Sequence, residues 1–594
     1  MACSWSTRSA RVVAAAGALL ALTVGTASAT RVSGTNDAET IRGTEAADVL
    51  LGRSGDDRVF GRGGADTIVG GPGFDRLWGG AGADRLLARD RARDLVTCGP
   101  GRDTAIVDVI DRVHASCEIV RRPTSTTESV PPPQEPVPVV LENAKPGTPG
   151  WASFGRAKGR AIEGYTDPSV APGGTLAFHV STSSDESYRV LVYRAGYYGG
   201  IGARRVACLP SCDGAAEGHE RTIPPAGPEG LVHANWPVSQ TLDIPADWVS
   251  GYYFAHFQLA SGPDAGRVTT TWFLVREAGA SRRAPILVQA SPTTWQAYNG
   301  WGGGSLYEFN SPNGRRAAKI AFDRPYDQPL EQRPEALEVP LARFLERNGY
   351  HVAYQADVDT ARDPASLEGR RVVVVAGHSE YWSKGMRDSF DAARDAGTDL
   401  AFFGANAAYW QIRYEDDFRT IVGYKSAAWD PETDPALETT QFRALVPPRY
   451  ECSLMGIQHA GGTLEWTTDG DYTVTADGAR DPWMKSAGFV PGDVVRGVVS
   501  REVDTIPGTQ SAQSSCGNAL TVLFHRELGT AESGDADAVR FTAASGAKVF
   551  ASGSHQFVWG LEDVPEVERM RHGMVDPRLQ AFVRAMLDDM LGTG

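Results

Sequence analysis

The chain has 594 residues, a formal net charge of −15 and a hydrophobic fraction of 42%. This length exceeds what one hydrophobic core supports, so we expect two to four domains. The acidic balance argues against a nucleic-acid partner and is consistent with a protein that recruits cations.

The first 29 residues are predicted to form a signal peptide. Arg8 and Arg11 precede an apolar stretch at 12–25, and the small residues 27–29 provide a cleavage site. The alternative is an uncleaved membrane anchor, but the stretch is shorter than the roughly 20 apolar residues that a helical span needs. No later segment approaches that length, so we predict a secreted, extracellular protein with no membrane span after processing.

Six cysteines follow the signal peptide and are predicted to form disulfides. Six cysteines allow about fifteen pairings in principle. Proximity in the sequence favours Cys98–Cys117, Cys208–Cys212 and Cys452–Cys516. An even count without C-x-x-C spacing is typical of disulfides in an oxidising compartment rather than of a zinc site.

Glycine and aspartate recur with a period of nine from residue 34 onward. The units open with glycine at 34, 43, 52, 61, 70 and 79, and their eighth positions are all aliphatic. The sixth position of five units is an aspartate: Asp48, Asp57, Asp66, Asp75 and Asp84. A glycine-rich linker is the alternative, but five aspartates in strict register argue against it.

This pattern resembles the haemolysin-type (repeat-in-toxin) calcium-binding repeat, G-G-x-G-x-D-x-U-x, which implies a parallel β-roll. Glycine permits the positive-φ turns, the aspartates and turn carbonyls offer hard oxygen ligands for Ca²⁺, and the aliphatic residues form a thin core. We expect ions around the five aspartates and folding coupled to calcium. Residues 97–117 would cap the roll, so that roll and cap occupy 30–121.

Two further regions follow the roll. Residues 122–149 are rich in Pro, Ser, Thr and Glu and are predicted to be a semi-extended linker. Residues 150–278 contain short alternating segments, such as 175–183, 188–196, 251–260 and 268–276, with turn signals between them. This rhythm predicts a β-sandwich.

Residues 279–594 are predicted to form an α/β domain. Apolar strands at 285–290, 351–354, 370–377 and 399–406 alternate with helical segments that end near Gly349 and Gly397. Such alternation favours a parallel sheet covered on both faces, with ligands beyond the carboxyl ends of its strands. Three successive strand ends deliver Trp295, Tyr298, Trp301, His378, Glu380, Tyr381, Asn406, Tyr409 and Trp410. An aromatic-lined site containing His and Glu is therefore expected there.

The motifs AYNGWGGGSLY, GHSEYW, FFGANAAYW and GVVSREVD make residues 150–594 similar to the large (β) subunit of N,N-dimethylformamidase. The resemblance implies a lectin-like sandwich, an α/β domain of the class I glutamine amidotransferase type, and a mononuclear iron held by two tyrosines and a glutamate. By motif these ligands are Tyr381, Tyr409 and Glu502, a hard-oxygen set suited to Fe³⁺. His378, Glu380 and His555 would then move protons.

Each of these residues also has a structural alternative. Tyr381 and Tyr409 could be core aromatics with satisfied hydroxyls, Glu380 could cap the following helix, and His378 could be a structural histidine. Ser379 lacks the second glycine of a G-x-S-x-G elbow.

The sequence therefore predicts a secreted calcium-binding protein with an iron-dependent hydrolase domain acting on the amide C–N bond of a small molecule. One rival is a non-catalytic protein that binds a glycan or cell-wall ligand at a cell surface. Another is a relative that keeps the fold and has lost the metal. The sequence is also compatible with an oligomer.

Overall fold

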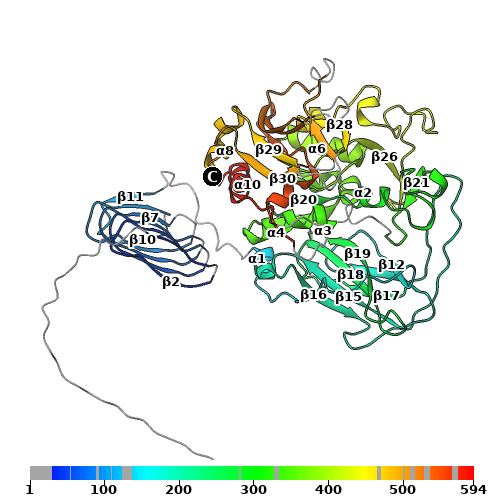
Figure 1. The fold of residues 1–594 in the computed structure, drawn as a ribbon, viewed down its shortest axis with the longest axis horizontal. Coiled ribbons are helices and arrows are strands. Elements are labelled where there is room, and N and C mark those ends of the chain that lie inside the picture. The colour runs from blue at the N-terminus through cyan, green and yellow to red at the C-terminus, as the bar shows by residue number, and fades with distance from the viewer. Residues whose placement is uncertain are drawn as a thin grey trace, which may run out of the picture. The chain divides into compact units, whose positions relative to one another are not determined.

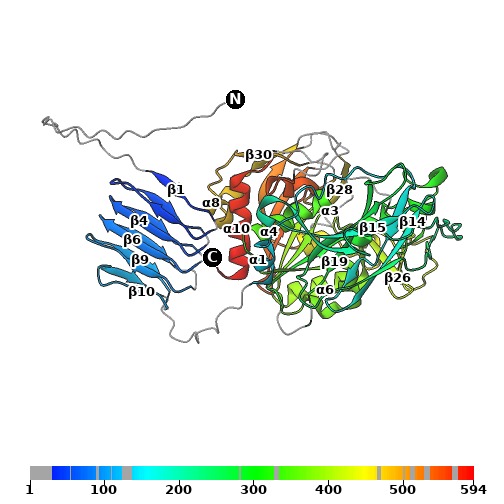
Figure 2. The same cartoon turned by 90° about the horizontal axis from the view of Figure 1, so that it is seen from below.

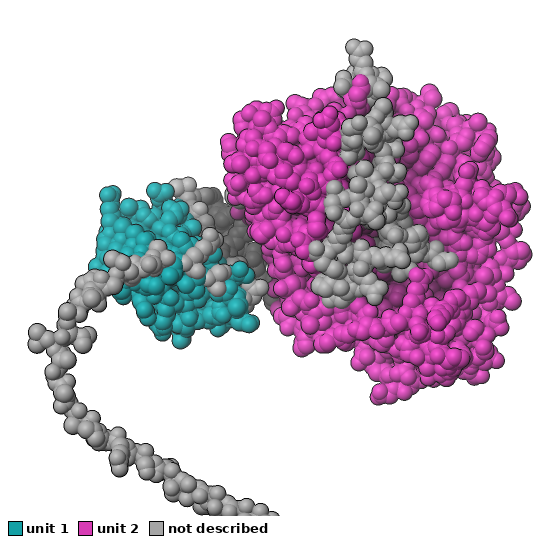
Figure 3. All heavy atoms as spheres, in the orientation of Figure 1, with its two compact units in different colours: residues 1–134 teal, residues 135–594 magenta. Residues whose placement is uncertain are grey.

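The structure is a computed structural model. It describes residues 30–593 except 36, 54, 72, 89–91, 109, 123–136, 278, 280–282, 327–333, 464–469, 500–501, 509–515, 528–534 and 565–572. The predicted signal peptide, 1–29, lies outside the described residues. The chain divides into two compact units, residues 1–134 and 135–594 (Figure 3).

The first unit is a β-roll of two parallel sheets, whose strands lie side by side in Figure 2. One sheet has the order β1-β3-β5-β7-β9-β11 and the other β10-β8-β6-β4-β2. Neighbouring strands are two repeats apart, as in the pairing of Leu50 with Ile68. The strands are β1 (Arg31–Ser33), β2 (Thr40–Arg42), β3 (Val49–Leu51), β4 (Arg58–Gly63), β5 (Thr67–Val69), β6 (Arg76–Ala81), β7 (Arg85–Ala88), β8 (Leu95–Thr97), β9 (Thr104–Val107), β10 (Arg112–Val113) and β11 (Ile119–Arg121).

The repeat positions explain this roll. The aliphatic residues at position eight are buried between the two sheets and form the core. Glycine is required at the turns: Gly55 has φ +110°, and a Cβ there would lie 2.7 Å from the carbonyl carbon of Asp37 in the coil above. The Cys98–Cys117 disulfide ties the last coils together, as predicted.

The segment predicted as a linker contains a folded helix. Helix α1 (Pro138–Asn143) belongs to the second unit, with Val139 buried and the Glu142 carboxylate accepting hydrogen bonds from Tyr198 and Arg204. The prediction of a spacer over 122–149 is therefore too long. The proline-rich composition of this segment gave no sign of the short helix, which buries the Val139 side chain and the Glu142 carboxylate that pairs with Arg204.

A β-sandwich follows α1 in the second unit and is coloured cyan to green in Figure 1. A three-stranded sheet, β12-β14-β17, faces a five-stranded sheet, β13-β19-β18-β15-β16. Phe178 of the first sheet packs edge-on against Phe257 and Phe273 of the second, which places the core between them. The strands are β12 (Ile162–Tyr165), β13 (Ser169–Val170), β14 (Thr175–Thr182), β15 (Tyr188–Ala195), β16 (Ala203–Leu209), β17 (Gln240–Asp243), β18 (Gly251–Leu259) and β19 (Val268–Val275).

The α/β part contains a nine-stranded sheet, in the order β22-β20-β23-β25-β34-β33-β32-β29-β30. The first five are parallel, as predicted, and the others antiparallel. Strand–helix alternation revealed only the parallel half, because the antiparallel strands lack crossover helices. The strands are β20 (Ile286–Ala290), β22 (Val352–Ala356), β23 (Val372–Ala376), β25 (Asp399–Phe403), β29 (Gly470–Val474), β30 (Val494–Val499), β32 (Thr521–Arg526), β33 (Ala536–Thr542) and β34 (Lys548–Ala551).

Helices and two smaller sheets complete this part. The small sheets join β21 (Lys319–Ala321), β27 (Thr420–Val422), β26 (Trp410–Glu415) and β24 (Tyr381–Ser383), and separately β28 (Gln458–Thr463) and β31 (Glu502–Thr505). The α-helices are α2 (Pro292–Ala297), α3 (Pro334–Leu337), α4 (Val339–Arg347), α5 (Asp357–Arg362), α6 (Lys384–Asp395), α7 (Cys452–Met455), α8 (Pro482–Ser486) and α10 (Pro577–Leu591). Short 3₁₀ turns include η8 (His555–Gly560). Among the described residues, no helix combines the length and apolar character that crossing a bilayer requires.

The sandwich and the α/β part share a buried polar interface. Arg194 of β15 pairs with Glu346 of α4 at 2.7 Å, with both side chains inaccessible to solvent. Glu338 accepts hydrogen bonds from the Tyr252 hydroxyl of β18 and the Trp295 indole of α2, each at 2.7 Å. Burial raises the pKa of Glu338 to about 8, despite these hydrogen bonds. The predicted disulfides Cys208–Cys212 and Cys452–Cys516 are also present in this unit.

Glu338→Gln is expected to stabilise the protein increasingly as pH rises from about 5 to about 8. Because the pKa of Glu338 is raised to about 8 from an ordinary 4.5, the folded state binds more protons, and the free energy of unfolding falls as pH rises through this window. Glutamine mimics the protonated acid, accepting from Trp295 and donating to Tyr252. Urea unfolding should show nearly equal stability near pH 5 and a gain for the variant of about 4 kcal/mol near pH 9. Parallel pH curves for the two proteins would contradict this assignment.

Candidate functional site

The carboxyl ends of three adjacent parallel strands converge in the α/β part. His378 follows β23, Asn406 follows β25 and His555 follows β34, and these strands are neighbours in the sheet. The loops after β23 and β25 pack backbone against backbone, since a Cβ at Gly404 would lie 2.0 Å from the Gly377 carbonyl oxygen. The sheet topology thus brings together side chains that are far apart in the sequence.

Glu502 reaches this edge from outside the sheet. Its strand, β31, pairs with β28, and Asp504 donates its backbone N–H to the carbonyl oxygen of Gly553, in the loop that carries His555. The Asp504 carboxylate in turn accepts the backbone N–H of Asn406 at 2.8 Å. These links hold Glu502 between the strand ends.

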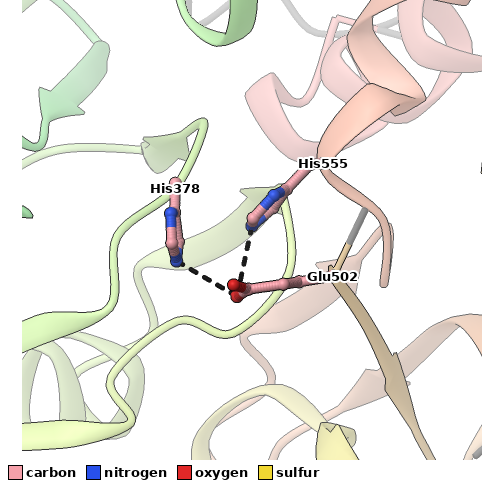
Figure 4. A group of neighbouring side chains, drawn as sticks. All are labelled: His378, Glu502 and His555. Carbon is pink, nitrogen blue, oxygen red and sulfur yellow. Dashed lines mark ion pairs between the residues drawn. The ribbon is translucent and has the colours of Figure 1, made fainter. Parts of the chain in front are cut away.

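Glu502, His378 and His555 form a cluster of side chains, with the Glu502 carboxylate at its centre. Its Oε2 lies 3.2 Å from His378 Nε2 and 4.0 Å from His555 Nε2, and both imidazoles point toward it in Figure 4. Asn406 donates its side-chain N–H to the same oxygen at 2.7 Å. Burial alone would raise the pKa of Glu502, but the charges of His378, His555 and His459 hold it well below its ordinary value. The cluster therefore keeps this buried carboxylate ionised.

Glu380 forms a second carboxylate next to His378. It accepts hydrogen bonds from the hydroxyls of Tyr298 at 2.8 Å and Tyr307 at 2.5 Å, and its Oε2 lies 3.5 Å from His378 Nε2. Its side chain does not cap helix α6, because Ser383 accepts the Met386 N–H there. The capping alternative for Glu380 is thus wrong, and His378 Nε2 lies between two carboxylates.

The two tyrosines expected as iron ligands have different surroundings. Tyr381 is fully buried, and its hydroxyl makes no hydrogen bond of ordinary geometry within the described residues. Burial, together with the charge of Glu380, raises the pKa of Tyr381 well above its ordinary value. Tyr409 is half-buried, with Arg443 over its ring and His459 at its edge. Tyr381 therefore offers a buried oxygen beside the cluster, whereas Tyr409 lies in a cationic environment.

The other residues expected in the site divide into two groups. Tyr298 and Asn406 join the cluster through the hydrogen bonds above, and Trp410 pairs with Tyr381 in the strand register. Trp295 and Trp301 instead connect the loop after β20 to other parts of the unit, through Glu338 and through Glu163 of β12. The presence of an aromatic residue after a strand does not by itself predict whether its side chain joins the site or contacts another part of the unit.

Sequence reasoning missed Tyr307, His459 and Lys425. Tyr307 ends a motif that the resemblance used, but its contact with Glu380 depends on the fold of the loop. The Lys425 ammonium lies 3.3 Å from the centre of the Tyr307 ring, and burial lowers the pKa of Lys425 to about 7, although the charge of Glu380 opposes this. A single lysine in a loop belongs to no sequence pattern that would predict a place in the site.

The β-roll contains rows of buried aspartates. Backbone N–H groups donate to the Oδ1 of the aspartate two repeats on, as from Asp48 to Asp66 at 2.7 Å. Buried Oδ2 atoms without a hydrogen bond among the described residues belong to Asp57, Asp66, Asp84 and Asp103. Burial raises the pKa of Asp84 to about 6, and the neighbouring carboxylates Asp66 and Asp103 add to this. Such uncompensated carboxylate oxygens fit Ca²⁺, which prefers hard anionic ligands.

A second donor set lies in the α/β part. One atom each of His378, Glu502 and His555 can be chosen so that all three lie within 4.8 Å of one another, and the three side chains are buried. Two imidazoles and a carboxylate are ligands of catalytic zinc and non-haem iron sites, which leave coordination positions open for substrate. These residues fit a transition-metal ion, and Glu502 is shared with the tyrosine set.

Comparison with protein families confirms both resemblances. The family described as N,N-dimethylformamidase beta subunit-like, C-terminal, matches residues 189–572, which is more than half of the chain. The family described as RTX calcium-binding nonapeptide repeat (four copies) matches two overlapping ranges, residues 33–68 and 60–90. No curated protein matches the chain. The chain therefore belongs to the N,N-dimethylformamidase beta subunit-like family and carries RTX calcium-binding repeats at its N-terminal end.

Proposed function

We propose that the α/β part is a metal-dependent hydrolase that cleaves the C–N bond of a small amide. The observation that carries this proposal is the convergence of His378, Glu502 and His555 at the carboxyl ends of adjacent strands, in a chain whose family is named after an amide-cleaving enzyme. The same topology is consistent with the glutamine amidotransferase type of α/β domain. The predicted signal peptide and the three disulfides support an extracellular location.

Glu502 anchors the ion in either of two donor sets. The geometry favours His378 and His555 as its partners, whereas the family resemblance implies Tyr381 and Tyr409 with Fe³⁺. When bound, the ion supplies Lewis-acid chemistry that polarises a carbonyl oxygen and acidifies a water molecule. The chain's own part is to keep Glu502 ionised and oriented, which Asn406 does through its 2.7 Å hydrogen bond.

Glu380 is the proton acceptor in this proposal. Tyr298 and Tyr307 orient its carboxylate, and its Oε2 faces His378 Nε2. A proton taken from water at this oxygen can be passed to the leaving amine, as amide hydrolysis requires. Since Glu380, Tyr298 and His378 are buried and Tyr307 is partly buried, the transfer would be shielded from bulk solvent.

Metal analysis with visible spectroscopy tests the proposal. The purified chain is expected to contain about one transition-metal ion and to release amine from N,N-dimethylformamide or a related amide. Glu502→Gln should lose both properties, whereas Glu368→Gln, at an exposed position, should keep them. A visible band that Tyr381→Phe abolishes would select the tyrosine set, and a colourless metalloprotein would select the histidine set. A wild-type chain without a transition metal would rule the proposal out and leave a binding protein.

A further inference from the structure

Lys425 is held in an unusual position beside the site. It follows β27 with φ +54°, in the left-handed region that a lysine rarely adopts. Both backbone polar groups of its neighbour Tyr424 are hydrogen-bonded. The Tyr424 N–H donates to the Thr439 hydroxyl at 2.9 Å, and the Tyr424 carbonyl oxygen accepts from Arg316 at 2.8 Å. The surrounding contacts therefore impose this backbone conformation and aim the side chain.

Three aromatic rings surround the Lys425 ammonium. Its nitrogen lies 3.3 Å from the ring centre of Tyr307, 4.9 Å from that of Trp410 and 5.0 Å from that of Tyr381. Trp410 and Tyr381 are partners in the parallel pairing of β24 with β26, so the register itself places their rings together. Within the described part of the chain, this ammonium forms no ion pair with a carboxylate. Ring faces stabilise a cation but leave its N–H donors available.

The Tyr307 ring connects this cation to the proposed proton acceptor and to solvent. Its hydroxyl donates to Glu380, and its ring lies 5.3 Å from that of Phe309, whose side chain is 70% exposed. A molecule that approaches Glu380 along Tyr307 would meet the apolar face of Phe309 and the ammonium of Lys425. Arg316 adds a second positive charge on this side.

We propose that the site takes an amide that also carries a carboxylate group, which Lys425 binds, while Phe309 contacts its apolar part. This inference rests on the proposed amide hydrolase function and names its substrate class. Neither nearby acid is paired with this ammonium among the described residues: Glu380 accepts hydrogen bonds from two tyrosines, and Glu502 is paired with His378. A charge-assisted hydrogen bond from the ammonium would then select anionic over neutral ligands.

Benzoate and benzamide test the inference, since they share shape and ring and differ in charge. Binding of each to the full chain and its variants is measured by calorimetry at one pH. Benzoate is expected to bind about tenfold tighter than benzamide or better. Lys425→Met should remove that preference, Lys425→Arg should retain part of it, and the surface variant Lys384→Met should behave as wild type. Phe309→Ala should weaken both ligands by the same factor.

Reductive methylation followed by peptide mass spectrometry gives a second reading. Benzoate, but not benzamide, should protect Lys425, and neither should protect Lys384. Equal binding of the two ligands, binding of neither, or a preference that survives in Lys425→Met would overturn the inference. Amine release is assayed separately: hydrolysis without charge preference defeats only the substrate class, whereas charge preference without hydrolysis defeats only the proposed activity.

Discussion

Removal of calcium is expected to unfold the β-roll and leave the second unit folded. The roll has a thin core and rows of buried aspartates, including Asp66 and Asp84, whose Oδ2 atoms have no hydrogen bond among the described residues. Without a cation these oxygens repel one another in a partly dehydrated setting, so binding free energy and folding free energy are coupled. Trypsin is a suitable probe, because Arg58, Arg76 and Arg85 lie on strands of the roll.

In excess chelator these sites should be cut rapidly, and millimolar calcium should slow cleavage by about tenfold or more, because digestion follows the population of the open form. Magnesium at the same concentration should protect much less, since it demands stricter octahedral geometry. Asp66→Asn should raise the calcium needed for protection, whereas Asp37→Asn, at an exposed position, should not. Peptides from the second unit report protease activity in the same digest. Calcium-independent protection of the roll would contradict coupled folding.

Arg194→Met is expected to destabilise the second unit by about 3–5 kcal/mol. Arg194 makes two hydrogen bonds to the Glu346 carboxylate, at 2.7 and 3.0 Å, and the variant leaves that carboxylate buried without its counter-ion. The Glu346 oxygens keep hydrogen bonds from Tyr354 and Asn143, which are too weak to replace a guanidinium. Urea unfolding of the second unit, followed by tryptophan fluorescence, measures the loss.

Two further variants separate charge burial from packing. The double variant Arg194→Met, Glu346→Met should recover much of the stability, because it removes both charges together. Lys384→Met breaks an exposed ion pair with Asp388 and should cost about 0.5 kcal/mol or less. If the single and double variants at the buried pair lose the same stability, the loss comes from packing and not from an unpaired charge.

The extent to which the sequence predicted this structure depends on how local each feature is. The nine-residue period of the roll and the alternating strands of the sandwich are local patterns, and both regions adopt the predicted architecture. Helix α1 was missed because its stability comes from contacts between Glu142 and the distant Arg204. The antiparallel half of the large sheet was missed because no helix–strand alternation marks it.

The candidate site shows the same division. His378, Glu380 and Asn406 were predictable, because parallel strands place successive strand ends at one edge. Glu502 and His555 entered through the family resemblance and through a motif, and their approach to His378 depends on β31 pairing outside the main sheet. The surroundings of Lys425 depend on the register of β24 with β26, which no local pattern encodes.

The division of the chain at residue 134 limits which fragments can be exchanged between proteins. The roll closes its own core and its own disulfide, so it can be transferred as a cassette or deleted without cutting a hydrogen bond of the candidate site. The sandwich lacks that independence, because Arg194 and Tyr252 satisfy carboxylates of the α/β part. A fusion that keeps the proposed chemistry must therefore begin before α1, and one that begins at the α/β part alone would carry two buried acids that have each lost a partner from the sandwich.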